Sequence, residues 1–331
     1  MTSRVRVRLP RLIALAALAV LPWLGSTAAA QTWPAKPVRI VFPYSAGGPV
    51  DVLLRAQAMR MSETLGQQFV VENRPGANEI IAAEAVARSA PDGYTLLFAS
   101  DAVFSLNPNL YSKLPYDASK DFVPIARVIN AYLMLVGRTD LPPKDLKELF
   151  AWVKANNGKV SYGSVGLGSV NHLSMSWLAG QQGLEMIHVP FKGVGPMVQE
   201  IVANRLDLAF AVVGGALPFL KANQVKAYAV SAPARMAVIP NVPTFTELGY
   251  PTLNASFYFA YAAPAGTSPE IVARVAAESG KIVTQADFRE KYTAALGFEP
   301  VAETPAQFAE FLKRDRENAA QRVKASGAKL D

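Results

Sequence analysis

The chain contains no cysteine and only two histidines among its 331 residues. Without cysteine it can form no disulfide, no thiolate metal site and no thiol nucleophile, and it cannot carry a lipid on an N-terminal cysteine. The two histidines, His172 and His188, lack the spacing of a metal-binding pair. The G-x-S-x-G motif of hydrolases is also missing, so no catalytic group assembles. We therefore expect a protein that is not an enzyme and holds no metal or cofactor.

Hydrophobic runs long enough to span a membrane are missing too. The run from Leu12 to Leu24 has 13 residues, whereas a membrane-spanning helix needs about 20. Four arginines and no acid precede this run, and the small residues 25–30 follow it. This order is typical of a signal peptide, so residues 1–30 are predicted to be removed by cleavage after Ala30. The alternative is an uncleaved anchor. Cleavage would place the protein in the periplasm.

In the rest of the chain, positive and negative charges nearly balance. Removal of residues 1–30 leaves 29 basic and 26 acidic residues and lowers the net charge from +7 to +3. The basic residues form no stripe or cluster, which argues against nucleic-acid binding, and the slight positive balance favours anionic solutes. The remaining 301 residues exceed the size of one hydrophobic core, so two lobes are expected.

Apolar strand-like runs alternate with helical patterns, which predicts an α/β protein. Strands are expected at 38–43, 69–72, 95–99, 123–128, 132–136, 160–162, 186–189, 206–211, 225–230 and 257–263. Helices are expected at 48–65, 80–88, 144–156, 169–180, 194–203 and 216–222, and two more begin at Ser268-Pro269 and Thr304-Pro305. Residues 100–120 have little periodicity and are predicted to be a long surface connection. The alternation restarts near residue 138, and the chain is expected to cross back near residue 260.

Two glycine-rich segments follow predicted strands and open predicted helices: residues 44–48 (Tyr44, Ser45, Ala46, Gly47, Gly48) and residues 163–169. Helix N-termini present free N–H groups and partial positive charge, which suit a carboxylate or a phosphate. The alternative is that both segments are only turns. The glycine offsets in 163–169 match neither the dinucleotide fingerprint nor, without the Lys-Ser/Thr pair, a Walker loop.

The two histidines have different expected roles. His188 lies in an apolar strand-like stretch, where a structural histidine is the favoured interpretation. His172 lies one turn into the helix after the second glycine-rich segment. It either points at a ligand or caps that helix, and the sequence does not separate these alternatives.

Several ordered motifs resemble one protein family. They are Trp-Pro-Ala-Lys-Pro at 33–37, Gly-Gly-Pro-Val-Asp at 47–51, Glu-Asn-Arg-Pro-Gly at 72–76, Ala-Pro-Asp-Gly-Tyr-Thr at 90–95, Leu-Pro-Tyr-Asp at 114–117, Val-Pro-Phe-Lys-Gly at 189–193, Asn-Val-Pro-Thr at 241–244 and Ala-Pro-Ala-Gly-Thr at 263–267. The chain thereby resembles the substrate-binding proteins of tripartite tricarboxylate transporters, the Bug (TctC-like) family, over almost its whole length.

The resemblance implies a type II periplasmic binding protein fold, with two doubly wound α/β lobes joined by crossing strands and a ligand cleft between them. On this basis lobe 1 is expected to comprise 31–137 plus 262–331, and lobe 2 to comprise 138–261. The expected function is capture of a small carboxylate-bearing solute by a monomer that delivers it to the subunits of a membrane permease. Alternatives are a ligand-presenting component of a signalling system and, third, an exported hydrolase or lyase.

The resemblance also implies which residues meet the ligand. In the two loops they are Tyr44, Ser45, Ala46, Gly47, Gly48, Ser164, Gly166, Gly168 and Ser169. Asp51, Asp101 and His172 lie in or next to these predicted segments and are added to the expected ligand-binding residues. The chain departs from the family pattern at Asn78-Glu79, at Asp101 and at Ala211. If Glu79 or Asp101 faces the cleft, a solute with an amino or hydroxyl group, or one of lower charge, is favoured over a tricarboxylate. The alternative is that both are solvated loop acids.

Overall fold

The structure is a computed structural model that describes residues 2, 33–251, 253, 256–326 and 328. Apart from residue 2, the predicted signal peptide and its cleavage site lie outside these residues. Among the described residues, no helix combines the length and the apolar character that a membrane span requires.

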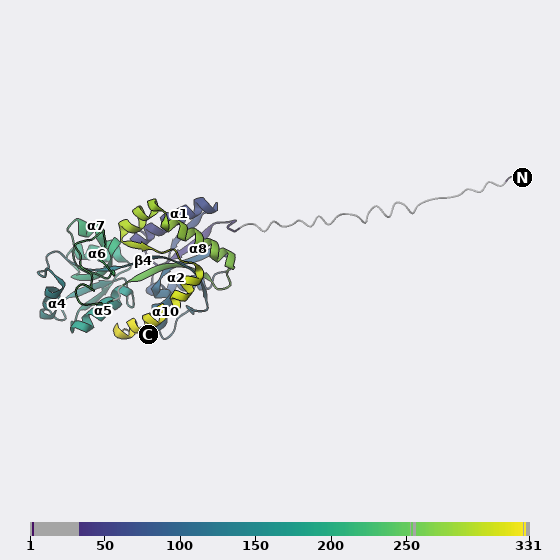
Figure 1. Cartoon of the computed structure of the whole chain (residues 1–331). Helices are drawn as coiled ribbons and strands as arrows, with labels where there is room; N and C mark the ends of the chain where they lie inside the picture. Colours follow the sequence, from purple (N-terminus) through teal and green to yellow (C-terminus); the bar gives the residue numbers. More distant parts are fainter. Residues whose placement is uncertain (1, 3–32, 252, 254–255, 327, 329–331) are drawn as a thin grey trace.

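The first of two β-sheets has six strands in the order β11-β4-β10-β3-β1-β2 (Figure 1). β1 pairs in parallel with β2 and β3, whereas β10 is antiparallel to both β3 and β4. β10 thus brings the chain back into this sheet after the second sheet is complete. The bounds are β1 (Val38–Phe42), β2 (Phe69–Asn73), β3 (Thr95–Ser100), β4 (Phe122–Ala131), β10 (Phe257–Pro264) and β11 (Phe298–Pro300).

The second sheet has five strands in the order β7-β6-β8-β5-β9. β6 is parallel to β7 and β8, and β5 is antiparallel to β8 and β9. β5 follows β4 after a single residue, so one extended segment supplies a strand to each sheet. The bounds are β5 (Leu133–Gly137), β6 (Ser161–Ser164), β7 (Ile187–Pro190), β8 (Leu208–Val212) and β9 (Lys226–Val230).

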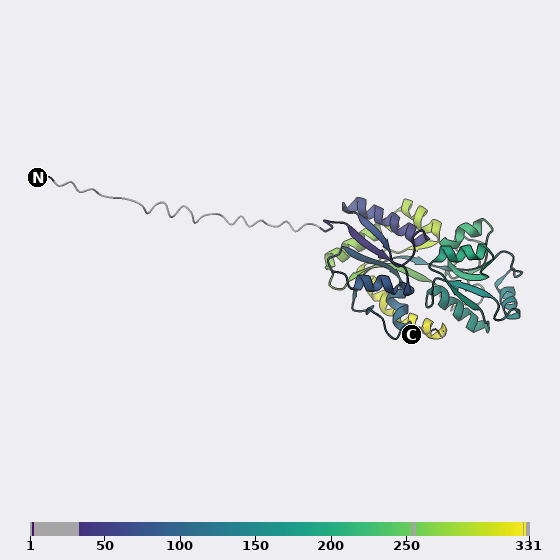
Figure 2. The ribbon, with the colours of Figure 1, turned by 180° about the vertical axis from the view of Figure 1, so that it is seen from behind.

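Helices cover both faces of the first sheet, as Figures 1 and 2 show from opposite sides. Because side chains alternate along a strand, Ile40 and Phe42 of β1 point to a core shared with α1 (Pro49–Leu65) and α8 (Pro269–Thr284). Val41 points to the opposite core, which contains α2 (Ile80–Ala87) and α10 (Pro305–Ser326). This is the doubly wound arrangement expected from the sequence.

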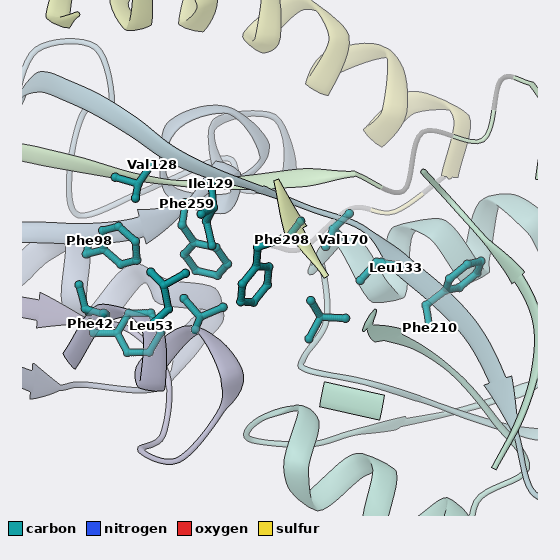
Figure 3. Packing of buried hydrophobic residues seen from close by; sticks show 14 of the residues in the cluster. Phe42, Leu53, Phe98, Val128, Ile129, Leu133, Val170, Phe210, Phe259 and Phe298 are labelled. Carbon is teal, nitrogen blue, oxygen red and sulfur yellow. The ribbon is translucent and has the colours of Figure 1, made fainter. Parts of the chain in front are cut away.

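The second sheet is covered in the same way. Leu135 and Phe210 pack with α4 (Leu146–Ala155) and α5 (Val170–Gln182), whereas Val136 and Ala209 pack with α6 (Val194–Val202) and α7 (Val213–Lys221). One core cluster runs from the first sheet into the second, with Ile129 of β4 and Leu133 of β5 at the junction (Figure 3). The crossing segment is therefore packed within the core.

The predicted helix starts at Ser268-Pro269 and Thr304-Pro305 are confirmed. Ser268 Oγ accepts the N–H of Ile271 at the start of α8. Before α10, Thr304 and Gln307 form the reciprocal pair of a capping box: Gln307 N–H donates to Thr304 Oγ1, and Thr304 N–H donates to Gln307 Oε1. Side-chain oxygens thus satisfy N–H groups that the helix itself leaves unpaired.

The prediction that residues 100–120 form a surface connection is wrong for the first half of that range. Ala102–Leu106 is a π-helical turn (η2) that continues into α3 (Asn107–Leu110), and every residue of the turn is buried. Phe104 packs edge-on against Phe122 and Phe308. A single wide turn has no repeating pattern, so hydrophobic periodicity could not reveal it. Short elements that were not predicted are η1 (Ala77–Glu79), α9 (Ala286–Phe288), η3 (Arg289–Thr293), η4 (Ala294–Leu296) and β11.

The chain changes sheets between β4 and β5 and again between β9 and β10. The division into lobes at residues 138 and 262 stays a prediction.

Two glycine substitutions should affect stability in opposite directions. A Cβ on Gly163 of β6 would lie 2.6 Å from Leu206 Cδ2 and 2.8 Å from Met197 Cγ, whereas one on Gly180 of α5 would meet nothing within 4 Å. We expect Gly163→Ala to lower the free energy of unfolding by about 1–3 kcal/mol through overpacking. Gly180→Ala should raise it by about 0.5–1 kcal/mol because alanine restricts the unfolded chain. Urea unfolding measures both, and equal changes would contradict the packing described for Gly163.

Candidate functional site

A cavity of about 450 Å³ is lined by residues from both halves of the molecule. From the first sheet and its helices come the loop after β1, the first turn of α1, and aromatic side chains of β1 and β10. From the second come the residues that open α5, α6 and α7. The lining includes Phe42, Tyr44, Ser45, Ala46, Gly47, Gly48, Asp51, Asn78, Ser100, Val165, Ser169, Gly193, Val194, Val212, Gly214, Phe219, Phe257, Phe259 and Leu296.

Four helices begin at this cavity, and three of them start without a side-chain cap. The N-cap positions of α1, α6 and α7 are Gly48, Gly193 and Val212, and none makes a side-chain capping hydrogen bond. Only α5 is capped, by Ser169. First-turn N–H groups and the positive ends of the helix dipoles therefore gather around one space, an arrangement that suits an anion.

The first glycine-rich loop, which was predicted to meet the ligand, lines the cavity. Gly47 has φ +88°, a conformation that favours glycine, and no atom lies within 4 Å of its missing side chain. Ser45 Oγ donates to the carbonyl of Lys192 at 3.4 Å, which links this loop to the residues before α6. The loop is thus open toward the cavity and tied to the second half of the molecule.

Asp51 also lines the cavity, but its carboxylate is engaged by neighbouring groups. It is only 2% exposed. Oδ2 accepts the N–H of Gly47 at 3.0 Å and Nε of Arg55 at 2.9 Å, and Oδ1 accepts Nδ2 of Asn73 at 2.8 Å. Burial raises the pKa of Asp51, but these hydrogen bonds outweigh burial and the net pKa is lowered. Asp51 therefore holds the glycine loop in place.

The second glycine-rich loop contributes less to the cavity than expected. Ser169 and Val165 line it, whereas Ser164, Gly166, Gly168 and His172 are not among its lining residues. Gly163 begins this segment, and side chains of the core around β6 occupy the space beside it. Which of these residues touch a ligand stays a prediction.

Both histidines fasten this second loop. His188 Nε2 lies 2.7 Å from Ser164 Oγ, and His172 Nδ1 accepts the N–H of Gly168 at 3.3 Å. The two ring centroids are 4.6 Å apart. Burial, and then the neighbouring His188, lower the pKa of His172 to about 4, and burial lowers that of His188. At pH 7 both rings are neutral and can accept hydrogen bonds from Ser164 and Gly168. Each histidine therefore contacts the second loop itself.

Glu79 is buried behind the cavity wall, so it is not the solvated loop acid of the alternative reading. It is 2% exposed. Tyr44 OH donates to Oε1 at 2.5 Å, Ser100 Oγ donates to the same oxygen, and Ser100 N–H donates to Oε2 at 3.0 Å. Burial raises the pKa of Glu79 despite these donors, and burial together with Glu79 raises that of Tyr44. Glu79 is therefore connected to the cavity by its hydrogen bonds to the lining residues Tyr44 and Ser100.

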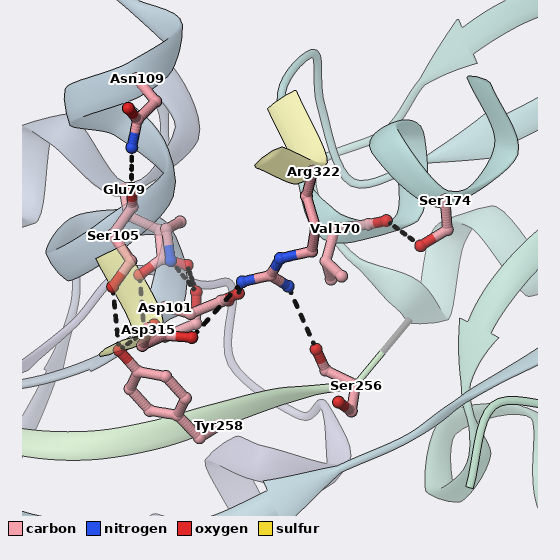
Figure 4. A network of polar contacts seen from close by, with 12 residues as sticks. Glu79, Asp101, Ser105, Asn109, Val170, Ser174, Ser256, Tyr258, Asp315 and Arg322 are labelled. Carbon is pink, nitrogen blue, oxygen red and sulfur yellow. Dashed lines mark hydrogen bonds and ion pairs between the residues drawn. The ribbon is translucent and has the colours of Figure 1, made fainter. Parts of the chain in front are cut away.

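Asp101 is also buried, and its ion-pair partner is Arg322 of α10 (Figure 4). Its Oδ2 accepts Nη2 of Arg322 at 3.3 Å, while Asp315 lies 3.6 Å from the same nitrogen and accepts the hydroxyl of Tyr258. Burial raises the pKa of Asp101 to about 7; the Arg322 charge opposes this rise, and Asp315 and Glu79 add to it. Asp101 is not among the residues that line the cavity.

The sequence reading did not anticipate the second-half helix starts or most of the apolar wall. The missed lining residues include Gly193, Val194, Gly214, Phe219, Phe257 and Phe259. Gly193-Val194-Gly195-Pro196 follows a predicted strand and opens a predicted helix, so the rule used for the first two loops would have found it. A Cβ on Gly214 would lie 2.3 Å from the Leu296 carbonyl oxygen, so glycine permits the close approach of α7 to η4.

Charged side chains contribute little to the lining of the cavity. Among the described residues, no lysine or arginine lines it, and no group of three or more His, Asp or Glu side chains could hold a metal ion. An anion there would depend on backbone N–H groups and helix dipoles.

Two helix-covered β-sheets with one cavity lined from both are an architecture found in periplasmic binding proteins. Residues 53–327 match the family described as "Tripartite tricarboxylate transporter family receptor". The chain belongs to this family of solute-binding proteins, as the resemblance of its motifs indicated. It is 36% identical to the "UPF0065 protein in the TAR-I ttuE-ttuC' intergenic region" of Agrobacterium vitis, over 93% of this chain and 89% of that protein. It is 33% identical to Protein BugT of Bordetella pertussis, over 93% and 94%.

Solved structures confirm the predicted fold class. The periplasmic binding protein BugD superposes with a TM-score of 0.85 at 31% identity, over 90% of this chain and all of that one. MatC of Rhodopseudomonas palustris, with bound malate, gives 0.82 at 32% identity over 88% and 99%. Rpa4515 of R. palustris, with adipate, gives 0.86 at 29% identity over 90% and 100%.

His172 should make stability depend on pH. The unfolded ring binds a proton near pH 6.5 and the folded ring near pH 4, so the unfolded state holds more protons between these values. The free energy of unfolding should therefore fall as the pH drops from 6.5 to 4. We expect about 1–2 kcal/mol after discounting for the ring's partial exposure.

The matched control is His172→Asn, whose amide oxygen can replace Nδ1 as the acceptor for Gly168 N–H but does not titrate. Urea unfolding at several pH values gives the difference between the two proteins, which isolates His172 from His188 and Asp101. An identical pH dependence in both proteins would refute this assignment.

Proposed function

We propose that the protein is exported to the periplasm, binds a small carboxylate-bearing solute in the cavity, and delivers it to a membrane permease. The observation that carries this proposal is the meeting of α1, α6 and α7 at one cavity, each without a side-chain cap. A carboxylate could accept hydrogen bonds from N–H groups that the helices leave unpaired. The malate and adipate bound by MatC and Rpa4515 support this solute class.

Binding is proposed to favour a closed arrangement of two lobes. The cavity is lined from both halves, so only an arrangement that brings the loop after β1 near the start of α6 lets both hold one anion. The Ser45 hydroxyl bonded to the Lys192 carbonyl is one contact that opening would break. The division at residues 138 and 262 remains part of this proposal.

The permease as partner follows from the family, whose receptors are named for tripartite tricarboxylate transporters. A protein with this function needs no catalytic residue, and the proposed site uses none. Presentation of the ligand to a sensor protein is the alternative role; deletion of the gene followed by uptake and induction assays separates the two.

Export predicts a defined mature N-terminus. Residues 1–30 have the order of a signal peptide, so the protein purified from the periplasm should begin at Gln31. Intact-mass measurement checks this directly. A periplasmic protein that retains residues 1–30 would contradict cleavage after Ala30.

Carboxylates should stabilise the exported protein against heat. A compound that binds only the folded state adds RT ln(1 + [L]/Kd) to the free energy of unfolding, about 2.7 kcal/mol at a hundred times Kd. A thermal-shift screen of mono-, di- and tricarboxylates should contain compounds that raise Tm. Stabilisation by a neutral compound, with no carboxylate effective, would refute the proposed solute class.

Gly48→Asp tests whether the helix N-termini are the anion site. Gly48 is the N-cap of α1, has an ordinary extended backbone, and has no atom within 4 Å of its missing side chain. An aspartate there should cap α1 and stabilise the unliganded protein by about 0.3 kcal/mol, because glycine is itself a tolerated N-cap. It should also occupy the site and repel a carboxylate, so the thermal shift should disappear.

Gly48→Asn is the matched control, because it caps the helix with nearly the same volume and without charge. It should retain more carboxylate binding than Gly48→Asp. Equal binding by both variants and the natural protein would place the anion elsewhere.

A further inference from the structure

Glu79 is a buried carboxylate one hydrogen bond away from the cavity. Its two contacts on the cavity wall are Tyr44 and Ser100, both of which line the cavity. Among the described residues it forms no ion pair with a lysine, an arginine or a histidine. All the partners that it has are neutral donors, so its charge is not balanced by a cation from the protein.

The hydrogen bonds of Glu79 fix the polarity of the wall that faces the solute. The protons of the Tyr44 and Ser100 hydroxyls both point at Oε1 of Glu79. Ser100 Oγ in addition accepts the N–H of Ala102 at 3.2 Å. Since each hydroxyl has one proton, Tyr44 can offer the cavity only an acceptor. At these two hydroxyls the wall can therefore accept hydrogen bonds and cannot donate them.

Asp101 adds further negative charge close to Tyr44. Asp101 and Asp315 share the single guanidinium of Arg322, which leaves one negative charge in excess when both acids are ionised. The uncapped N-termini of α1, α6 and α7 line the same cavity, those of α6 and α7 from the second half of the molecule. The cavity is thus positive where these helices begin and negative toward Tyr44 and Glu79.

We propose that the solute is an amino carboxylate whose ammonium group faces Tyr44 and whose carboxylate faces the helix N-termini, with Glu79 as the residue that sets this preference. The inference rests on the proposed carboxylate function and names the solute class within it. An ammonium donates a hydrogen bond to Tyr44 Oη and supplies the positive charge that balances the carboxylate of Glu79. A hydroxyl group supplies the donor only, and a solute without either leaves the acceptor unpaired.

The local backbone shows that this arrangement is held firmly. Ala77, Asn78 and Glu79 all have positive φ, at 47°, 47° and 72°, a conformation that costs non-glycine residues free energy. Asn78 is fixed by two hydrogen bonds with Asn107, and Glu79 by Tyr44 and Ser100. A strained segment persists only where its surroundings determine it, and here they place the carboxylate behind the wall.

Matched solutes test the preference by isothermal titration calorimetry on the exported protein. One series is phenylalanine, 3-phenyllactate and 3-phenylpropanoate, which fits the aromatic lining; the other is aspartate, malate and succinate. Within a series the amino compound should bind most tightly and the compound without a donor about tenfold to a hundredfold more weakly. Equal affinities within a series, or the reverse order, would overturn this inference and leave the carboxylate function intact. Failure of every compound would overturn both.

Glu79→Gln should reverse the polarity of the wall. The amide nitrogen, in place of Oε1, can donate to both hydroxyls, while the amide oxygen keeps the Ser100 N–H. The Tyr44 proton is then free to point into the cavity. We expect the amino compound to bind about tenfold or more weakly, and the compound without a donor to bind as well as before or better, so that the order flattens or inverts.

Two further variants separate specificity from folding. Glu72 lies on β2, where its carboxylate pairs with Arg39 and Arg74, and it does not line the cavity. Glu72→Gln should therefore leave the order of affinities unchanged. Tyr44→Phe keeps the ring packed between Phe42 and Phe259 but removes the acceptor, so it should reduce the advantage of the amino compound. If Glu79→Gln and Tyr44→Phe both weaken all compounds by the same factor, Glu79 has only a structural role and the inference fails.

Discussion

The passage of one extended segment through both sheets is the constraint on which the cavity depends. β4 and β5 are separated only by Tyr132, and β10 carries the chain back as an antiparallel partner of β3 and β4. Parallel strands direct their carboxyl ends to one edge of each sheet, where the following helices begin. Since the two sheets are joined at these strands, the starts of α1, α5, α6 and α7 can line the same space.

In the part of the chain that the structure describes, no cationic side chain lines the cavity, so its proposed polarity has to come from other groups. Backbone dipoles provide the positive end, and they cannot be neutralised by a change of pH. Buried carboxylates provide the negative end, but they are expensive to bury and need donors. Tyr44 and Ser100 meet this need and also form the wall. The same hydrogen bonds therefore stabilise Glu79 and select what the wall accepts.

Regular elements were predictable because their patterns repeat, and the remainder was not. The alternation of strands and helices, the start of α1 at Pro49 and the capping box at Thr304 follow from local rules. The turn at Ala102–Leu106 has no period, and the burial of Glu79 and Asp101 involves partners 21 and 221 positions away in the sequence. The glycine loop after β1 could be located because a glycine-rich turn between a strand and a helix is a local sequence signal. The structural contact of His188 agrees with the favoured interpretation, whereas the contact of His172 with Gly168 depends on how the second loop folds.

The C-terminal helix shows why Asp101 has a role other than the one expected. Arg322 of α10 holds Asp101 and Asp315, and it also donates to the Ser256 carbonyl just before β10. One turn of the same helix places Ala319 and Val323 against Leu173 of α5. α10 therefore contacts helices of both sheets near the returning strand. A carboxylate in this network must stay paired with Arg322, because a lone buried charge would cost several kcal/mol. Asp101 thus anchors the helix that spans the junction.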